Sequence, residues 1–332
     1  MKVTLKTIAE DTGFSISTVS RVLNNSDKIS SDTHVKVLTS AAKLGYNVGK
    51  DEDSKSKKNF NVALLATGFH EGEFYSSFFH GLNKSAKKNN VRLFLNALLS
   101  HEDDVIKLTK NLASDYFDGF ILFIPEFLID DYNRLASALP NDIPIVSNSL
   151  IENPVFPTLT FDSYSGGYLA AEHLKNQGYE KVGIILGPPE RSESRFRKNG
   201  FIDYVSQQQS MKLIWTCPGD FTFESGVRAC EKYHEEGEKP DAIFATNDSM
   251  ATGFLQKAKS YGYALPENVA LIGYDDLPNN LYTNPTISSI HTDYEKLGDA
   301  TIKALLERID KSNLRSNLLS LVPVSVSHKG SS

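Results

Sequence analysis

Hydrophobic residues follow two alternating patterns along most of the chain, namely short continuous runs and longer segments with an apolar stripe. Beyond residue 60 the short runs are typical of strands that are buried on both faces. The predicted strands are Val62–Thr67, Val91–Ala97, Gly119–Ile124, Ile143–Asn148, Leu159–Phe161, Val182–Leu186, Leu213–Thr216, Ala242–Thr246 and Val269–Tyr274. Amphipathic helices are predicted between them, for example at Phe78–Asn89, Gly167–Gln177, Glu224–Glu235 and Met250–Gly262. This alternation predicts parallel sheets covered by helices, and its length favours two doubly wound α/β lobes over one.

The start of the chain has a helical pattern instead. Ile8 and Ala9 lie at helical spacing from Leu5, and Gly13 is suited to end that first helix in the left-handed conformation. Ser15 is a favourable N-cap for a second helix. The apolar stripe of the second helix consists of Val19, Val22 and Leu23. Two short helices joined by a tight corner predict either a helix-turn-helix or an ordinary helical hairpin, and spacing alone does not separate them.

The polar residues of the second helix favour DNA recognition. Arg21 can donate two hydrogen bonds to guanine, and Ser17 or Thr18 can reach a base or a phosphate. Residues 1–58 hold ten Lys and Arg against seven Asp and Glu, a net charge of +3, whereas the rest of the chain carries −9. Because phosphate contacts depend on local charge, we expect the N-terminal part to bind DNA and the acidic part not to.

Residues 4–24, with the sequence TLKTIAEDTGFSISTVSRVLN, closely resemble the headpiece of the LacI/GalR family of bacterial repressors. Residues 29–33 (ISSDT) and 41–46 (AAKLGY) are similar to its third helix. The resemblance implies a homodimer whose two headpieces engage half-sites of a double-stranded operator. The implied phosphate contacts come from Thr4, Ser15, Thr18, Ser20 and Asn24, and the implied base contacts from Ile16, Ser17 and Arg21.

Residues 48–60 depart from the family pattern. They are charged and almost free of apolar residues, which predicts a flexible tether. Most family members carry Ala-Arg-x-Leu on a short hinge helix that inserts a leucine pair into the minor groove, and neither that motif nor any leucine occurs here. We therefore expect effector binding in the larger part of the chain to be weakly coupled to DNA binding by the N-terminal part, and we expect little bending of DNA.

Polar and aromatic residues follow many of the predicted strands in the acidic part. In open α/β sheets ligands bind beyond the carboxyl ends of strands, so this distribution favours a cleft for a small polar ligand. Several segments also resemble the family's effector domain, which is similar to periplasmic sugar-binding proteins: FYSSFFHG (74–81), FDSYSGG (161–167), RKNGF (197–201), ATNDSMA (245–251) and LIGYDD (271–276). The resemblance implies ligand contacts from Phe74, Arg191, Arg197, Asn247 and Asp275, with Phe221 stacked on the ligand.

The predicted fold class is accordingly an all-α helix-turn-helix headpiece followed by a two-lobed, doubly wound α/β domain of the periplasmic-binding-protein type. The predicted domains are the headpiece at 1–47, the linker at 48–60 and the effector-binding and dimerisation domain at 61–328. Within the last, lobe 1 is expected at about 61–161 and 291–322, and lobe 2 at about 162–290.

The function predicted from these features is a transcriptional regulator, a repressor, whose operator affinity changes when a small polar effector binds. Sugars are the commoner effectors of the family, so we favour a sugar, although the same residues could hold a purine. The alternative from another class is a sugar-binding or sugar-processing protein with a vestigial DNA-binding head. A transport binding protein is disfavoured because the chain starts without an apolar signal core.

The remaining sequence features bear on enzymatic activity, cofactors, membrane association and disulfides. Nucleophile-elbow, zinc-protease and phosphate-loop motifs are missing, so we expect no enzymatic activity, no cofactor and no metal. No run approaches the roughly 20 apolar residues of a membrane helix, which predicts a cytoplasmic protein with no membrane partner. Cys217 and Cys230 are expected to be reduced thiols.

Overall fold

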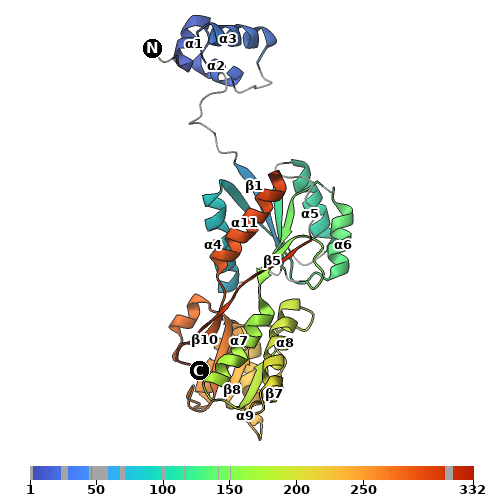
Figure 1. Cartoon of the computed structure of the whole chain (residues 1–332), viewed down its shortest axis with the longest axis vertical. Coiled ribbons are helices and arrows are strands. Elements are labelled where there is room, and N and C mark those ends of the chain that lie inside the picture. The colour runs from blue at the N-terminus through green and yellow to red at the C-terminus, as the bar shows by residue number, and fades with distance from the viewer. Residues whose placement is uncertain are drawn as a thin grey trace. The chain divides into compact units, whose positions relative to one another are not determined.

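The chain divides into two compact units, residues 1–58 and 59–332, which are described separately below (Figure 1). The structure is a computed structural model, and the residues it describes are 3–23, 29–44, 46, 59–67, 72–98, 102–115, 117–140, 142–149, 151–310 and 317–332. None of the helices in these ranges is long and apolar enough to cross a membrane.

The N-terminal unit is a small helical domain. Its helices are α1 (Leu5–Thr12), α2 (Ile16–Leu23) and α3 (Ser31–Lys43). Gly13 ends α1 at φ +73°, with its amide donating to Ala9 O at 2.9 Å, and the Thr18 amide of α2 donates to Ser15 Oγ at 3.1 Å. The helices enclose a core made of Ile8, Ala9, Val19, Val22, Val37 and Ala41. The helix-turn-helix arrangement and its corner residues are thus as the sequence predicts.

The larger unit contains two sheets, each covered by helices on both faces. Lobe 1 is built on the sheet with strand order β11-β5-β4-β3-β1-β2, whose described pairs are all parallel. Its elements are β1 (Phe60–Thr67), α4 (Glu73–Lys88), β2 (Val91–Leu98), α5 (Glu102–Asp115), β3 (Gly119–Phe123), α6 (Ile129–Ala138), β4 (Ile145–Ser147), β5 (Thr158–Phe161), α11 (Tyr294–Asp310) and β11 (Leu319–Val322). Helices α4 and α11 cover one face of this sheet, and α5 and α6 cover the other (Figure 1).

Lobe 2 repeats this topology on the sheet with strand order β12-β10-β9-β8-β6-β7. Its elements are α7 (Ser163–Asn176), β6 (Lys181–Ile185), α8 (Ser192–Gln207), β7 (Lys212–Cys217), α9 (Phe223–Glu235), β8 (Ala242–Ala245), α10 (Asp248–Ser260), β9 (Ala270–Asp275), the 3-10 helix η1 (Pro278–Tyr282), β10 (Ser288–His291) and β12 (Ser325–Ser327). Among the described pairs only β10 with β12 is antiparallel. The chain crosses between the lobes after β5, after β10 and after β11.

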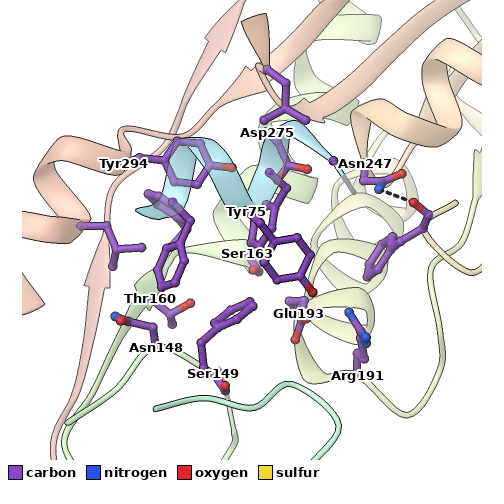
Figure 2. Close-up of a pocket in the computed structure, with 18 of the residues that line it drawn as sticks. Tyr75, Asn148, Ser149, Thr160, Ser163, Arg191, Glu193, Asn247, Asp275 and Tyr294 are labelled. Atoms are coloured by element: carbon purple, nitrogen blue, oxygen red, sulfur yellow. Dashed lines mark hydrogen bonds between the residues drawn. The ribbon is translucent and has the colours of Figure 1, made fainter. Parts of the chain in front are cut away.

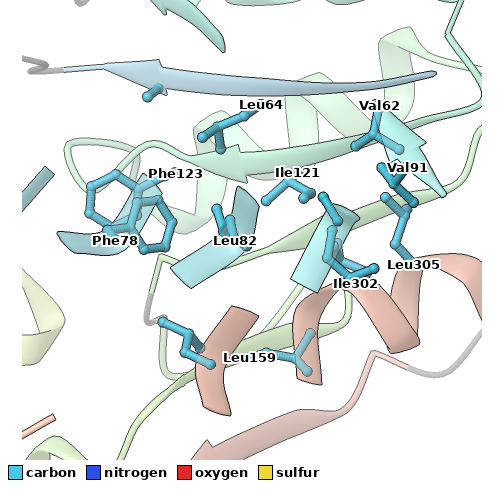
Figure 3. Close-up of a cluster of buried hydrophobic side chains, with 14 of the residues drawn as sticks. Val62, Leu64, Phe78, Leu82, Val91, Ile121, Phe123, Leu159, Ile302 and Leu305 are labelled. Carbon is cyan, nitrogen blue, oxygen red and sulfur yellow. The ribbon is translucent and has the colours of Figure 1, made fainter. Parts of the chain in front are cut away.

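The sheets are stabilised by apolar cores on both faces. In lobe 1, Figure 3 shows Leu64 and Ile121 of the sheet facing Phe78 and Leu82 of α4, while Ile302 comes from α11. All of these side chains are at most 3% exposed, and burying each contributes roughly 1.5 to 3 kcal/mol relative to leaving it in water. Both cysteines are free, as expected, and both are buried in lobe 2, where burial raises the pKa of the Cys230 thiol to about 12.

The predicted strands correspond to β1 through β9, but β10, β11 and β12 were not predicted. Strand β10 is buried although its sequence, Ser-Ser-Ile-His, has a single apolar residue. Its serines are paired inside the protein, because the Ser288 amide donates to Ser331 Oγ and Ser289 Oγ donates to Asp248. Hydrophobic patterning cannot find a strand whose burial depends on such hydrogen bonds.

Helices α7 and α8 are in close contact at two glycines, one on each helix. A Cβ added at Gly167 would lie 1.9 Å from Arg197 O, and one at Gly200 would lie 2.0 Å from Tyr164 O. The backbones of α7 and α8 are therefore in direct contact, and this contact fixes the position of the Arg197 backbone.

We therefore expect Gly167→Ala to destabilise lobe 2 by about 1 to 3 kcal/mol, because the backbone atoms it meets cannot move aside. Urea unfolding followed by the fluorescence of Trp215, the chain's single tryptophan, reports on this lobe. Gly237→Ala is the control, since an added Cβ there meets nothing within 4 Å. Equal stability of the two variants would contradict the role given to this close approach.

Candidate functional site

A cavity of about 140 Å³ lies between the lobes, at the carboxyl ends of their strands (Figure 2). Both lobes and the crossing segments contribute to it. The residues that line it are Gly72, Glu73, Phe74, Tyr75, Phe78, Phe123, Asn148, Ser149, Thr160, Phe161, Ser163, Arg191, Glu193, Arg197, Phe221, Asn247, Ser249, Asp275, Leu277, Tyr294 and Leu297. This is the position where open parallel sheets bind ligands.

Arg197 is the buried cation of this cavity. It projects from α8, is 7% exposed, and its Nη1 donates to Thr246 O at 2.6 Å. Its guanidinium carbon lies 3.6 Å from the centre of the Tyr274 ring, while Nη2 lies 3.5 Å from Asp275 Oδ1. These contacts hold the guanidinium in one place, because a cation over an aromatic face and beside a carboxylate is stabilised from both sides. Among the described residues, its Nε has no hydrogen-bond partner.

Two buried carboxyl groups lie at or beside β9. Asp275 ends β9 and is 5% exposed, and Asp248 begins α10 and is 2% exposed. Burial raises the pKa of both groups above the usual range for aspartate, and the Asp275 charge raises that of Asp248 further. Asp248 accepts hydrogen bonds from the Leu277 amide, Asn280 Nδ2 and Ser289 Oγ, at 2.7 to 2.8 Å. The Asp275 carboxylate faces Arg197, with Oδ1 3.5 Å from Nη2.

The backbone is strained beside these groups. Asp275 has φ +109°, Asp276 +56° and Phe221 +69°, values that residues with a side chain rarely adopt. Asn247 holds the Phe221 segment in place, because its Nδ2 donates to Phe221 O at 2.9 Å while its Oδ1 caps α10 through the Met250 amide. Strain of this kind persists where the surrounding contacts fix a functional geometry.

Aromatic rings form the wall of the cavity that lobe 1 contributes. Phe74 packs against Phe78, Phe123 and Tyr294, with ring centres 5.7 to 6.2 Å apart. Phe221 lies on the opposite wall, in lobe 2, with its ring centre 5.6 Å from the Arg197 guanidinium carbon. A flat or ring-shaped ligand would thus find apolar faces on one side and charged groups on the other.

Polar contacts join the two lobes at the rim of the cavity. Arg191 of lobe 2 donates through Nη2 to Glu126 Oε1 of lobe 1 at 2.9 Å, and Glu126 also accepts from Thr67 Oγ1. Further contacts of this kind join Arg195 to Glu152 at 2.7 Å and the Asn279 amide to Glu73 at 2.7 Å. Because these groups are partly exposed, each contact contributes at most about 1 kcal/mol.

A second candidate surface lies on the N-terminal unit. Helix α2 buries Val19 and Val22, and the opposite side carries exposed Ile16, Ser17 and Arg21. Ile16 is 50% exposed. Ser15 Oγ lies 2.8 Å from both Ser17 Oγ and Thr18 Oγ1, so hydroxyl groups gather at the start of this helix.

Comparison with known proteins identifies both units. Residues 4–48 match the family described as "Bacterial regulatory proteins, lacI family". The chain belongs to the LacI family. Residues 171–332 match the periplasmic binding protein-like domain, in agreement with the topology of the larger unit.

Relatives of this LacI-family chain cover nearly its whole length. The transcriptional repressor PurR of Haemophilus influenzae (strain PittEE) is 28% identical over 308 residues, which are 92% of this chain and 91% of that protein. The structure of the Lac repressor dimer bound to operator and the anti-inducer ONPF has a TM-score of 0.77 at 24% identity, covering 100% of this chain and 99% of that one. The complex of the transcriptional regulator CelR with cellobiose has a TM-score of 0.72 at 24% identity and covers 100% of both chains.

The structure brings all six predicted effector contacts of this LacI-family chain to one cavity: Phe74, Arg191, Arg197, Phe221, Asn247 and Asp275. Of the predicted DNA contacts, Thr4, Ser15, Ile16, Ser17, Thr18, Ser20 and Arg21 lie on or next to α1 and α2. Asn24 and linker residues 48–58 lie outside the described residues, so the predictions about them stay predictions.

Several lining residues were not predicted. Asn148 and Ser149 directly follow β4, so the rule that ligands bind beyond strand ends could have found them. Tyr294 begins α11 just after the unpredicted strand β10. Glu126 lies outside this lining but is the partner of Arg191, a pairing across 65 positions of sequence that no local pattern indicates.

The raised pKa of Asp275 gives a testable dependence of stability on pH. A carboxyl group whose pKa is raised by folding stabilises the protein when protonated, and this stability is lost as pH rises through the folded pKa. Burial lowers the pKa of His173 to about 4, so this histidine makes the unfolding free energy rise with pH. That rise is complete above pH 6.5, the ordinary pKa of histidine. Between about pH 6.5 and 8.5 we expect the unfolding free energy of lobe 2 to fall.

Asp275→Asn should make that fall shallower, because the variant has no charge to bury at this position. Urea unfolding monitored through Trp215 at several pH values measures the slope. Asp203→Asn is the control, because this aspartate lies on α8 outside the cavity. A slope in Asp275→Asn as steep as that of the unchanged protein would contradict the assignment.

Proposed function

We propose that this chain is a homodimeric transcriptional repressor whose affinity for its operator changes when a small polar effector binds between lobes 1 and 2. The observation that carries the proposal is the convergence of the buried Arg197, its carboxylate partner and an aromatic wall in one cavity of a LacI-family chain. An effector that contacts both lobes favours one degree of closure over another, and this difference in affinity is what shifts the equilibrium.

The DNA-binding role rests on α2. Its N-terminal turns present Ile16, Ser17 and Arg21 to solvent, which is the arrangement of a helix that enters the major groove. Thr4, Ser15, Thr18, Ser20 and Asn24 are proposed to contact phosphates. A homodimer supplies two such helices for a pseudo-palindromic operator, in line with the dimer named for the Lac repressor structure.

The proposed effector is a sugar. Arg197, Asn247 and Asp275 offer paired donors and acceptors for neighbouring hydroxyl groups, while Phe221 offers a face for the ring. The CelR complex with cellobiose, a protein of the same fold, supports this choice. A nucleobase is the second candidate, because relatives are named PurR and the cavity is rich in aromatic side chains.

No enzymatic activity is proposed for the cavity. The relatives reported above are named as repressors or regulators, and a binding role accounts for the buried groups without a chemical step. A purified chain that converted a sugar or nucleoside into product would instead favour the sugar-processing alternative.

Arg21→Ala tests the DNA-binding proposal. Operator sequences are first selected from random duplexes with the full-length protein, and binding of both proteins to the selected site is then measured at fixed salt. We expect the variant to lose about 1 to 3 kcal/mol on the selected site and to tolerate any base at one position. Lys36→Ala on α3 is the control for loss of one positive charge. An equal loss on every sequence would mean that Arg21 contacts only phosphate.

A thermal-shift screen of sugars and nucleobases tests the effector proposal. A ligand that binds only the folded protein raises its melting temperature, by an amount that grows with concentration. We expect a sugar to raise the melting temperature of the unchanged chain and of Lys198→Ala, but not of Phe221→Ala. A shift caused by nucleobases alone would replace the sugar with the second candidate.

A further inference from the structure

We infer that the effector carries a protonated amine and that Glu193 is the residue that selects it. The inference rests on the proposed function and narrows its ligand from a small polar molecule to a cationic one, of which an amino sugar is the form consistent with a sugar effector. Glu193 lies on the first turn of α8 and lines the cavity beside Arg191 (Figure 2).

The first argument is the balance of charge in the cavity. Among the described lining residues the cations are Arg191 and Arg197, whereas the acids are Glu73, Glu193 and Asp275. Glu126 and the buried Asp248 add two more carboxyl groups directly behind this lining. Burial raises the pKa of Asp275 to about 7 and that of Asp248 to about 8, which leaves Glu73, Glu126 and Glu193 against the two arginines near pH 6.5. In the described part of the chain the site thus has a small excess of negative charge, and a ligand that brings positive charge would gain electrostatic energy there.

The second argument is that the neighbouring charges are already engaged while Glu193 is not. Arg191 is bound to Glu126 at 2.9 Å, and Glu73 accepts from the Asn279 amide at 2.7 Å. Arg195, the next cation along α8, donates to Glu152 and to the carbonyl oxygens of Pro189 and Glu190. No hydrogen bond or ion pair reaches the Glu193 carboxylate from the described residues.

The third argument is a buried acceptor without a donor. Asn148 is 4% exposed, and its Nδ2 donates to Leu159 O and Thr301 Oγ1, both at 2.8 Å, which fixes the orientation of the amide. Its Oδ1 has no hydrogen-bond partner among the residues that the structure describes, although Asn148 lines the cavity. A buried acceptor left unpaired costs about 1 to 3 kcal/mol, so this wall too favours a ligand rich in N–H and O–H groups.

An amine fits these needs better than a metal ion. The described residues contain no group of three or more His, Cys, Asp and Glu side chains placed to hold a metal. A protonated amine has three donors and no acceptor, so it can bind a single free carboxylate and still donate to a second acceptor. Burial is the main cause of the raised pKa of Asp275, and the charge of Glu193 raises it further, which places both acids in one electrostatic environment.

Calorimetric titration of the full-length chain with matched hexoses tests the inference. The probes are glucosamine, galactosamine and mannosamine, each beside its neutral parent hexose and its N-acetyl derivative, at about pH 6.5, where the amines are charged. We expect at least one aminohexose to bind about 10- to 100-fold more tightly than both of its neutral counterparts, as a charged hydrogen bond predicts. Raising the salt concentration should reduce the difference.

Glu193→Gln is the decisive variant, because it keeps the shape of the side chain and removes its charge. We expect it to abolish the preference for the amine, so that the aminohexose and its neutral parent bind the variant with affinities within about twofold of each other. Glu190→Gln is the matched control, since Glu190 is exposed on the same segment and does not line the cavity. A circular dichroism melt of each variant verifies that it is folded.

Three results would overturn the inference: neutral hexoses that bind as tightly as the amines, no binding of any aminohexose, or a preference for the amine that survives in Glu193→Gln. The first and third leave the proposed effector-responsive repressor intact, because a ligand still binds between the lobes. The second does not by itself contradict the proposed function. Binding to the selected operator and the wider screen of sugars and nucleobases test that function separately, because neither depends on Glu193.

Discussion

The buried guanidinium of Arg197 is the interaction on which the architecture of the cavity depends. Removing a cation from water is costly, so the protein must surround it with groups that replace its hydration. Tyr274 lies under its face, Thr246 O accepts from one nitrogen, and Asp275 faces another. These partners come from the ends of β8 and β9, so placing one arginine requires the helix α8 and two adjacent strands to keep a fixed register.

That requirement extends into the packing of lobe 2. Helix α8 can hold Arg197 at the strand ends only because α7 approaches it at glycine positions, where no side chain separates the two backbones. The strained backbone at Asp275 and Phe221 lies beside the same guanidinium, because the Asp275 carboxylate and the Phe221 ring both face it. Burying these charges and straining the backbone destabilise lobe 2, and the apolar cores on both faces of its sheet offset this cost.

The sequence allowed most of this arrangement to be predicted, for reasons that differ between elements. Strands β1 through β9 are apolar runs, and the polar residues after them, such as Asn247 and Asp275, mark the ligand edge of each sheet. Strand β10 escaped prediction because its buried serines depend on partners from the end of the chain and from Asp248. Glu126 escaped for a related reason: its importance comes from facing Arg191 across the cavity, and only the three-dimensional fold brings these residues together.

The distribution of polar contacts explains how such a cavity can respond to a ligand. The contacts that join the lobes lie at the rim, are partly exposed and are individually weak, so they do not lock one degree of closure. The groups inside are buried and incompletely paired, as Arg197 Nε and Asn148 Oδ1 illustrate. Interactions inside are therefore stronger than those at the rim, because they form in a less polar environment. A ligand that completes the interior pairs can supply more energy than the rim contacts do, and it is then the ligand, rather than the protein alone, that decides how the lobes are held.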